Sequence, residues 1–301
     1  MLVIRPLQES DLDDLYTMAQ NAGKGLTTLP ADRELLQKKI THARETFNQR
    51  VAPEAGLYLF ALEDTQSKKT VGISGIQARV GLDEVFYNYR LSVTVNASKE
   101  LGVHVRTPTL HLSNDMTDTS EICSLLLSDD YKGGGNGLLL SRSRFMYLDE
   151  FRQHFSEKVF AEMRGVSDAE GRSPLWDALG SKFFDMEFTE ADVLSGLGNK
   201  SFIAELMPKY PIYLPMLPDS ARAVISSGPS AGVLYQRGTN PQRMARRCRV
   251  PASLVTVARR EMLAWKVSPA RIRSWPRATA SRGSNTSRHR TRTPRSRRRF
   301  A

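Results

Sequence analysis

Six consecutive residues near the middle of the chain combine a cation with a flexible backbone: Lys132, Gly133, Gly134, Gly135, Asn136 and Gly137. Glycine lets the backbone turn tightly and approach a ligand closely, because it has no Cβ to obstruct either. An apolar run precedes this segment at residues 122–127, and a helical pattern follows it at once. The free N–H groups and the dipole of a helix N-terminus form an anion site. We therefore predict a phosphate or pyrophosphate cradle, with a plain loop between two elements as the alternative.

The spacing of these residues does not fit two common phosphate motifs. The segment lacks the Gly-x-x-x-x-Gly-Lys-Ser/Thr pattern of a P-loop. It also lacks the acidic residue that a dinucleotide-binding βαβ unit places downstream. The pattern instead resembles the loop that holds the coenzyme A diphosphate in the GNAT acyltransferase superfamily. It consists of a basic residue, two spacers, Gly, one spacer and Gly, directly after a strand. Lys132 stands where that superfamily usually has Arg or Gln, and Lys supplies a cation without the bidentate fork of Arg.

The elements around this segment predict an α/β or α+β domain with a mixed sheet. Strands are expected at residues 2–4, 57–62, 71–80, 85–95, 106–112, 122–127, 159–163 and 202–206, the second and third as a hairpin. Helices are expected after a capping box at residues 10–13, at 31–48, at 137–155, after Ser173 and from Asp219 to Ile225. The helix at 137–155 is predicted to bury five apolar side chains, namely Leu138, Leu139, Phe145, Leu148 and Phe151.

Charge is distributed unevenly along the 301 residues, whose formal net charge is +11. Residues 226–301 hold 18 Arg, one Lys and one acidic residue, a net of +18, whereas residues 1–225 carry a net of −7. We therefore predict a mildly acidic domain at 1–225 followed by a basic, low-complexity segment at 226–301. The sequence shows no secretory signal and no run of 18 apolar residues, so we expect a cytoplasmic protein without membrane association.

Other residues that often do chemistry are sparse. Cys123 and Cys248 are too far apart in sequence to suggest a metal site or a disulfide framework. Cys123 lies in the apolar run and is predicted to be a small core residue and not a nucleophile. His104 and His111 are predicted to be surface or satisfied core residues. We therefore expect no metal and no permanently bound cofactor.

Several segments, spread in order over residues 1–225, resemble the arginine N-succinyltransferase family: GLTTLP at 25–30, SEIC at 120–123, GGGNG at 133–137, LSRSRF at 140–145, AEMRGVSD at 161–168, SPLW at 173–176 and FIAELMPKYPIY at 202–213. The resemblance implies a GNAT-like fold with a mixed, largely antiparallel sheet flanked by helices. It implies transfer of a succinyl group from the co-substrate succinyl-CoA to the α-amino group of L-arginine, the first step of arginine catabolism. Some members form two-subunit enzymes that also accept ornithine, so a homo- or hetero-oligomer is expected.

The resemblance also implies which residues meet the co-substrate. The position of Leu125 is the one that the family assigns to succinyl-CoA contact, and the loop from Lys132 to Gly137 takes the diphosphate. The transfer needs a neutral amine, a base that takes its proton and an acid that protonates the departing thiolate. Direct attack needs neither a covalent intermediate nor a metal. Glu121 and Asp115 are candidate carboxylates near the loop, with a structural role as the alternative for each.

The resemblance ends at Ile225. The family continues with Gly-x-Val-His-Pro, whose His is assigned as the proton donor, and Pro229 stands at that place here. We predict that residues 226–301 are translated out of frame and disordered, which would leave a succinyltransferase of impaired activity. The alternatives are a basic tail that binds nucleic acid through its phosphates and a disordered tail without a partner. A third class of function is a non-catalytic subunit that binds CoA.

Overall fold

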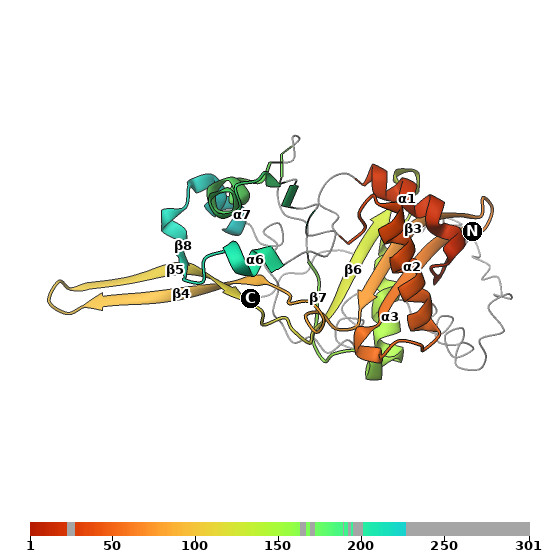
Figure 1. The fold of residues 1–301 in the computed structure, drawn as a ribbon, viewed down its shortest axis with the longest axis horizontal. Coiled ribbons are helices and arrows are strands. Elements are labelled where there is room, and N and C mark those ends of the chain that lie inside the picture. The colour runs from red at the N-terminus through yellow and green to blue at the C-terminus, as the bar shows by residue number, and fades with distance from the viewer. Residues whose placement is uncertain are drawn as a thin grey trace, which may run out of the picture.

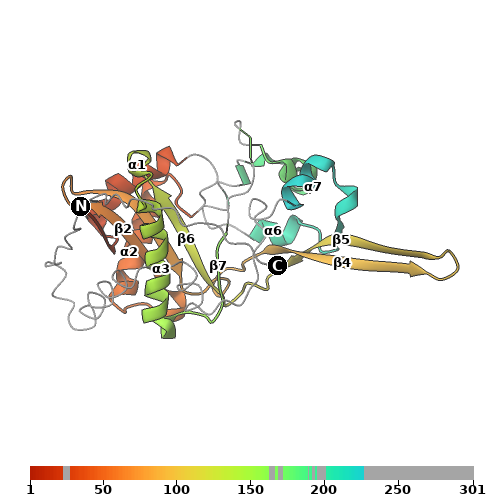
Figure 2. The same ribbon diagram turned by 180° about the vertical axis from the view of Figure 1, so that it is seen from behind.

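The computed structural model describes residues 1–22, 28–162, 167–168, 172–188, 190–191, 194 and 201–226. Their strands form two sheets, one of five strands in the order β1-β2-β3-β6-β7 and one of three strands in the order β4-β5-β8. Figures 1 and 2 show α1 and α2 on one face of the larger sheet, α3 on the other face, and the smaller sheet projecting to one side. The apolar run that the sequence singles out lies in the larger sheet, and the glycine segment follows it and leads into α3.

The larger sheet consists of β1 (Leu2–Pro6), β2 (Leu57–Asp64), β3 (Lys69–Gln77), β6 (Ser120–Leu127) and β7 (Val159–Phe160). Every pair of neighbours is antiparallel except β6 and β7, which run parallel. The predicted hairpin is confirmed as β2 and β3. The prediction of a mixed, largely antiparallel sheet flanked by helices is therefore confirmed.

The two faces of the sheet bury different side chains because successive residues of a strand point to opposite sides. Leu59 and Ala61 of β2 pack in the cluster that includes residues of α1 (Leu12–Asn21) and α2 (Arg33–Phe47). Tyr58 and Phe60 pack against α3 (Asn136–Glu150). Each fully buried side chain of this size stabilises the fold by about 1.5–3 kcal/mol. The sheet thus has a helix layer on each face, and both layers are held by the same strands.

A partly buried cluster of ion pairs and hydrogen bonds joins β1, β2 and β3. The Arg5 guanidinium donates two hydrogen bonds to the Asp11 carboxylate, both 2.7 Å long, and its Nε donates to Glu63 at 2.5 Å. Asp11 also accepts from the Gln8 backbone N–H at 2.7 Å and from the Thr70 hydroxyl at 2.9 Å. Burial opposes ionisation of Asp11, but these donors outweigh it and lower the pKa of the carboxyl below its ordinary value.

The smaller sheet extends away from the main body as a long two-stranded ribbon (Figure 1). Its strands β4 (Asn88–Ser98) and β5 (Val103–Ser113) pair along their whole length, and β8 (Ile212–Tyr213) pairs with β5 only at Thr109 and Leu110. Apolar side chains are exposed on the ribbon: Leu91, Val93, Val95, Leu101, Val103 and Val105. Isolated two-stranded ribbons are marginally stable in water, so this one depends on packing at its base.

The base of the ribbon packs against the helices of the second half of the chain. The helix predicted after Ser173 is confirmed; it contains a π-helical turn (Trp176–Gly180) and continues as α4 (Ser181–Phe184). The predicted helix near the end of the described chain is α7 (Asp219–Ser226). Leu110 of the ribbon lies in one cluster with Ala221 and Ile225 of α7. The ribbon is therefore anchored at one end and solvent-exposed along the rest.

One predicted strand is wrong, because residues 202–206 lie within helix α6 (Ser201–Leu206). The Met207 N–H donates to the Ile203 carbonyl at 3.0 Å, and both side chains pack in the cluster that contains Leu179 and Phe184. Short apolar runs do not distinguish a strand from a buried helix, and the spacing of four between Ile203 and Met207 is the helical signal.

Four further predictions need correction. The capping interaction uses Gln8 and Asp11, before a 3-10 turn, and not the residues at 10–13. Helix α3 ends at Glu150, five residues before the predicted end. Leu138 is 57% exposed, whereas Leu140 is fully buried, because the first turn of α3 directs residue 138 to solvent. The predicted boundaries of β3, β4 and β5 also shift by up to three residues.

Asp11→Asn is expected to lower the free energy of unfolding at pH 7 by about 1.5–3 kcal/mol, because it removes one of the two carboxylates that pair with the partly buried Arg5 guanidinium. A carboxyl whose pKa is lowered by folding contributes stability that is present above its unfolded pKa of about 4 and is lost as the pH falls through the folded value. The difference between wild type and variant should therefore shrink as the pH falls from 7 to 3. Urea titrations at several pH values measure it.

Asp13→Asn is the matched control, because Asp13 lies two residues away and its side chain is 79% exposed. Its loss should change the free energy of unfolding by about 0.5 kcal/mol or less. An equal effect of both substitutions would contradict the role given to Asp11.

Candidate functional site

The glycine segment forms an open turn that leads directly into α3. Gly133, Gly134 and Gly135 have φ angles of +97°, +58° and +85°. Residues that carry a Cβ rarely adopt positive φ angles, so the backbone conformation at these positions favours glycine. A Cβ added at any of the three would have no neighbour within 4 Å, so the space above the turn is open. Gly135 is the N-cap of α3, and the first N–H groups of a helix lack acceptors within the helix. This geometry is suited to an anion.

The side chains beside the turn shape it without filling it. Lys132 Nζ forms an exposed ion pair with Asp129 Oδ1 at 2.5 Å. Exposed pairs contribute about 0–1 kcal/mol, so this lysine can exchange its partner for a ligand anion at small cost. The Asn136 amide donates to the Tyr131 carbonyl at 3.0 Å, and the Tyr131 hydroxyl donates to Asp64 at 3.0 Å. The turn is thus tied back to the end of β2.

Strand β6, which leads into the turn, contains a β-bulge. Cys123 is paired with Gly75, but the next residue in register is Leu126, paired with Ile73. Ser124 lies within the irregularity with a φ of +52°, a conformation that is uncommon outside glycine. Leu125, for which the family resemblance implies contact with the co-substrate, follows it and is 45% exposed. The strand predicted at 122–127 is therefore present but interrupted at this point, where the bulge directs Leu125 outward.

The second edge of β6 is open over most of its length. Strand β7 pairs with β6 only at Ser120 and Glu121. Among the residues that the structure describes, no other strand pairs with this edge between Ile122 and Leu127. The strand predicted at 159–163 contains only two residues, and residues 163–166 lie outside the described part. Within the described part of the chain, the backbone of β6 is thus unpaired on this edge along the stretch that ends at the glycine turn.

Glu121 and Cys123 lie on the face of β6 that is directed toward α1 and α2. Glu121 is buried at the point where β6 and β7 separate. Burial, with a smaller contribution from the nearby Glu121 carboxylate, raises the pKa of the Cys123 thiol to about 12. A thiol with that pKa is almost fully protonated at neutral pH, so it is a poor nucleophile. Cys123 is therefore suited to packing and not to forming a covalent intermediate.

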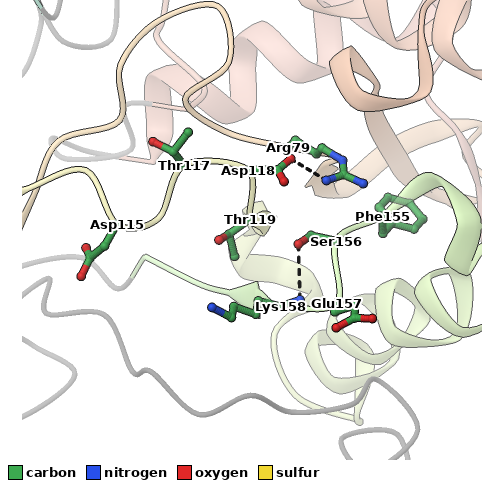
Figure 3. A pocket seen from close by; sticks show the side chains of 9 residues that line it. All are labelled: Arg79, Asp115, Thr117, Asp118, Thr119, Phe155, Ser156, Glu157 and Lys158. Atoms are coloured by element: carbon green, nitrogen blue, oxygen red, sulfur yellow. Dashed lines mark hydrogen bonds and ion pairs between the residues drawn. The ribbon is translucent and has the colours of Figure 1, made fainter.

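Asp115, the other candidate carboxylate, lies in a polar pocket at the opposite end of β6 from the glycine turn (Figure 3). It accepts a hydrogen bond from the Asn88 amide at 2.9 Å and lies 4.0 Å from an Arg90 nitrogen. Burial opposes its ionisation, but these partners hold its pKa below the ordinary value. The eight residues of β6 separate this end from the turn by about 25 Å, so the prediction that both carboxylates lie near the loop is wrong.

The same pocket is lined by cations as well as acids. Arg79 donates to Asp118 at 2.5 Å across its rim, and Lys158 and Glu157 line the opposite side. Figure 3 shows these side chains around the start of β6 and the segment before β7. Of the charged side chains that line the pocket, Arg79 and Asp118 pair with each other. The described residues contain no group of three or more His, Cys, Asp or Glu side chains that could bind a metal ion.

Two features of the site were not predicted from the sequence. The first is the irregularity in β6 itself, although Gly72 and Gly75 on the neighbouring strand indicated a bulge or a close approach there. The second is Arg144 of α3, which is 3% exposed and donates from Nη1 to the Cys123 carbonyl at 3.1 Å. Its position, four residues after Leu140 and four before Leu148, places it on the buried stripe of the helix. That spacing was the available signal.

A bulged strand that leads through a glycine turn into a helix matches the arrangement expected of the GNAT-like fold. The family model described as arginine N-succinyltransferase beta subunit matches residues 2–235. The chain belongs to the arginine N-succinyltransferase family. This is a family of acyltransferases, and the match confirms the resemblance on which the sequence-based prediction rests. The match extends to residue 235, so the prediction that the resemblance ends at Ile225 is wrong by ten residues.

Individual relatives agree with this assignment. The arginine N-succinyltransferase subunit beta of Pseudomonas aeruginosa is 51% identical over 224 residues, which cover 74% of this chain and 66% of the relative. An arginine N-succinyltransferase of Enterobacter is 48% identical over 79% of this chain and 71% of its own length. The solved arginine/ornithine succinyltransferase subunit AI of Pseudomonas aeruginosa superposes with a TM-score of 0.68 at 36% identity, covering 74% of this chain and 65% of that one. The chain thus spans about two thirds of the length of such relatives.

Some sequence-based predictions are not tested by the structure. The predicted basic segment from residue 227 onward lies outside the described residues, as do Pro229, Cys248 and most of the residues at 163–171. No helix within the described ranges has both the length and the apolar character needed to cross a bilayer.

Proposed function

We propose that this chain transfers the succinyl group of succinyl-CoA to the α-amino group of L-arginine, with turnover lowered by the loss of the family His at the place of Pro229. The observation that carries the proposal is the bulged, open-edged strand β6 leading into the glycine turn, in a chain of this family. The reaction belongs to arginine catabolism. A cytoplasmic location follows, because acyl-CoA thioesters are intracellular metabolites.

The co-substrate lies along β6 in this proposal. The diphosphate is held by the turn and the start of α3, that is by Lys132, Gly133, Gly134, Gly135, Asn136 and Gly137. The pantetheine arm pairs with the open edge of β6 and passes the exposed side chain of Leu125. The thioester then reaches the part of β6 where β7 begins to separate. The support for this placement is the positive φ of the three glycines and the open space above them.

The chemistry at the thioester requires little from the protein. The neutral amine attacks the thioester carbonyl, a base takes the proton of the amine, and the thiolate leaves and is protonated. We assign the base to Glu121, because it is buried on β6 where the two parallel strands separate. Asp115 is excluded from this role because it lies in a separate polar pocket, where it already pairs with Asn88. Transfer is direct, because the Cys123 thiol is not ionised.

Gly135→Ala is expected to weaken CoA binding about tenfold, which corresponds to about 1.4 kcal/mol. Alanine resists a φ of +85°, so the turn must relax and its N–H groups move away from the diphosphate. Isothermal titration calorimetry with CoA measures the affinity.

Gly102→Ala is the matched control, because Gly102 has a φ of +63°, lies in the turn of the ribbon and also has open space at its Cβ position. It should bind CoA as the wild type does. A wild-type protein that does not bind CoA, or equal affinities of the two variants, would overturn the placement of the diphosphate.

Glu121→Gln is expected to lower kcat for CoA release in the presence of L-arginine by about 10²- to 10⁴-fold, the usual contribution of a general base. Its affinity for CoA should stay that of the wild type. A thiol assay of CoA release, with and without L-arginine, measures the rate.

Asp115→Asn serves as the comparison, since it removes the other candidate carboxylate and should leave kcat within about threefold of the wild type. A larger loss in this variant than in Glu121→Gln would reverse the assignment. CoA binding without arginine-dependent release in the wild type would instead support a non-catalytic subunit.

We further propose that the chain assembles as a subunit through the ribbon. The relatives from Pseudomonas aeruginosa are named as subunits, and the ribbon is the described element with the longest row of exposed apolar side chains. Leu91, Val93 and Val95 alternate along β4, so they share one face. Burying this face against another subunit would remove the exposed apolar area.

Replacing Leu91, Val93 and Val95 with Thr is expected to convert an oligomer into single chains, because threonine keeps the strand propensity and removes much of the apolar contact. Sedimentation velocity at micromolar concentration compares the two proteins. The proposal fails if the wild type sediments as a single chain or if the variant keeps the wild-type mass.

A further inference from the structure

Arg144 is a buried cation whose surroundings do not explain it as a stabilising residue. Its side chain points from α3 toward β6, and Figure 2 shows the two elements side by side. Nη1 donates to the Cys123 carbonyl at 3.1 Å, Nε to the Ser141 carbonyl at 3.2 Å and Nη2 to the Ser141 hydroxyl at 3.1 Å. Within the described ranges, no carboxylate lies close enough to form an ion pair with it.

Burying a charge without a counter-ion costs free energy, because the hydration of the ion is lost and no opposite charge replaces it. Burial accordingly lowers the pKa of Arg144. The neighbouring buried positions of the same helix hold apolar or aromatic side chains, Leu140, Phe145 and Leu148. An apolar residue at position 144 would therefore pack on this stripe without the cost of desolvation. Stability alone does not account for the arginine.

The atom that Arg144 contacts lies at the bulge. Cys123 is the last residue of β6 in regular register before the irregularity, and Ser124 follows with its positive φ. Bulges disrupt the ladder locally, and strained backbone persists only where its surroundings fix it. The neighbouring strand β3 leaves space for the Cys123 side chain at Gly75. A Cβ at Gly75 would lie 2.9 Å from Leu59 Cδ2 and 3.1 Å from Cys123 Sγ. Arg144 supplies the complementary contact, a charged donor on the carbonyl that precedes the strained residue.

We propose that Arg144 is a positioning residue that fixes the bulge of β6, so that Leu125 and the open edge of the strand are held in the conformation that receives the acyl-CoA arm. This inference rests on the proposed function in one respect, the binding of the arm along β6. The guanidinium acts through the backbone of Cys123 and does not touch the substrate. Burial of the charge thus costs stability, and in return the conformation of the strand that binds the ligand is fixed.

The experiment compares Arg144→Met with Arg144→Lys. Hydrogen exchange followed by mass spectrometry measures protection of residues 122–127, and calorimetry measures the affinity for CoA. In Arg144→Met, exchange of this peptide should rise about tenfold and CoA affinity should fall about tenfold, as expected for loss of a charge-assisted hydrogen bond. The midpoint of urea unfolding should stay constant or rise, because the buried charge is gone. Lysine keeps a donor for the Cys123 carbonyl and should restore part of both properties.

Arg142→Met is the matched control, because it removes a charge two residues away on the same helix, from a position that is not fully buried. It should leave exchange and affinity unchanged. If Arg144→Met does not fold, Ser141→Ala tests the same idea, since it removes the acceptor of Nη2 and should raise exchange of residues 122–127 by a smaller factor.

The outcomes separate this inference from the proposed function. Unchanged exchange of residues 122–127 in both Arg144→Met and Ser141→Ala would overturn it, whatever the affinity. Raised exchange with wild-type CoA affinity would overturn the link to ligand binding. A wild-type chain that does not bind CoA would refute the proposed function, while the exchange data would still decide whether Arg144 holds the bulge.

Discussion

Strand β6 keeps β3 as its partner from Glu121 to Leu127 but pairs with β7 only at its first two residues. An interior strand normally has its backbone groups paired on both edges, so a one-sided strand in the middle of a sheet leaves polar groups for another partner. The bulge adds local twist and bends β6 as it leaves β7. The exposure of Leu125, the direction of the chain into the glycine turn and the position of the α3 N-terminus all follow from this divergence.

Keeping one edge of a strand open requires that the rest of the sheet be held firmly. On the far side, the Arg5 and Asp11 pair joins three strands through buried, charge-assisted hydrogen bonds. On the α3 face, the rings of Tyr58, Phe60 and Tyr147 pack edge to face or tilted, with centroids 5.0–5.2 Å apart. Such pairs add about 0.5–1.5 kcal/mol beyond the area that they bury. The helix that begins at the glycine turn is thus fixed to β2, two strands away from the open edge.

The sequence predicted the strand, turn and helix because each depends on local chemistry: an apolar run, consecutive glycines and a helical repeat. It did not predict the irregularity in β6, which depends on the register between β6 and a strand about 50 residues earlier. It also did not predict that Arg144 points inward, because charged residues on helices are usually exposed. The helix at 201–206 was missed because six residues show too little of either period. Asp115 was placed near the loop by sequence proximity, whereas the strand between them separates its two ends by its full length.

The charges along β6 change sign in an order that suits an acyl-CoA. Lys132 and the helix N-terminus lie at the end where an anionic diphosphate would bind, and the Glu121 carboxylate lies at the end where an amine must lose its proton. Between them is Cys123, a thiol in the strand that we propose receives a thioester. An ionised thiol at that place would compete with the amine for the acyl group. Burial keeps the thiol protonated, and the nearby carboxylate does so further, so the group proposed as the base also disfavours the competing reaction.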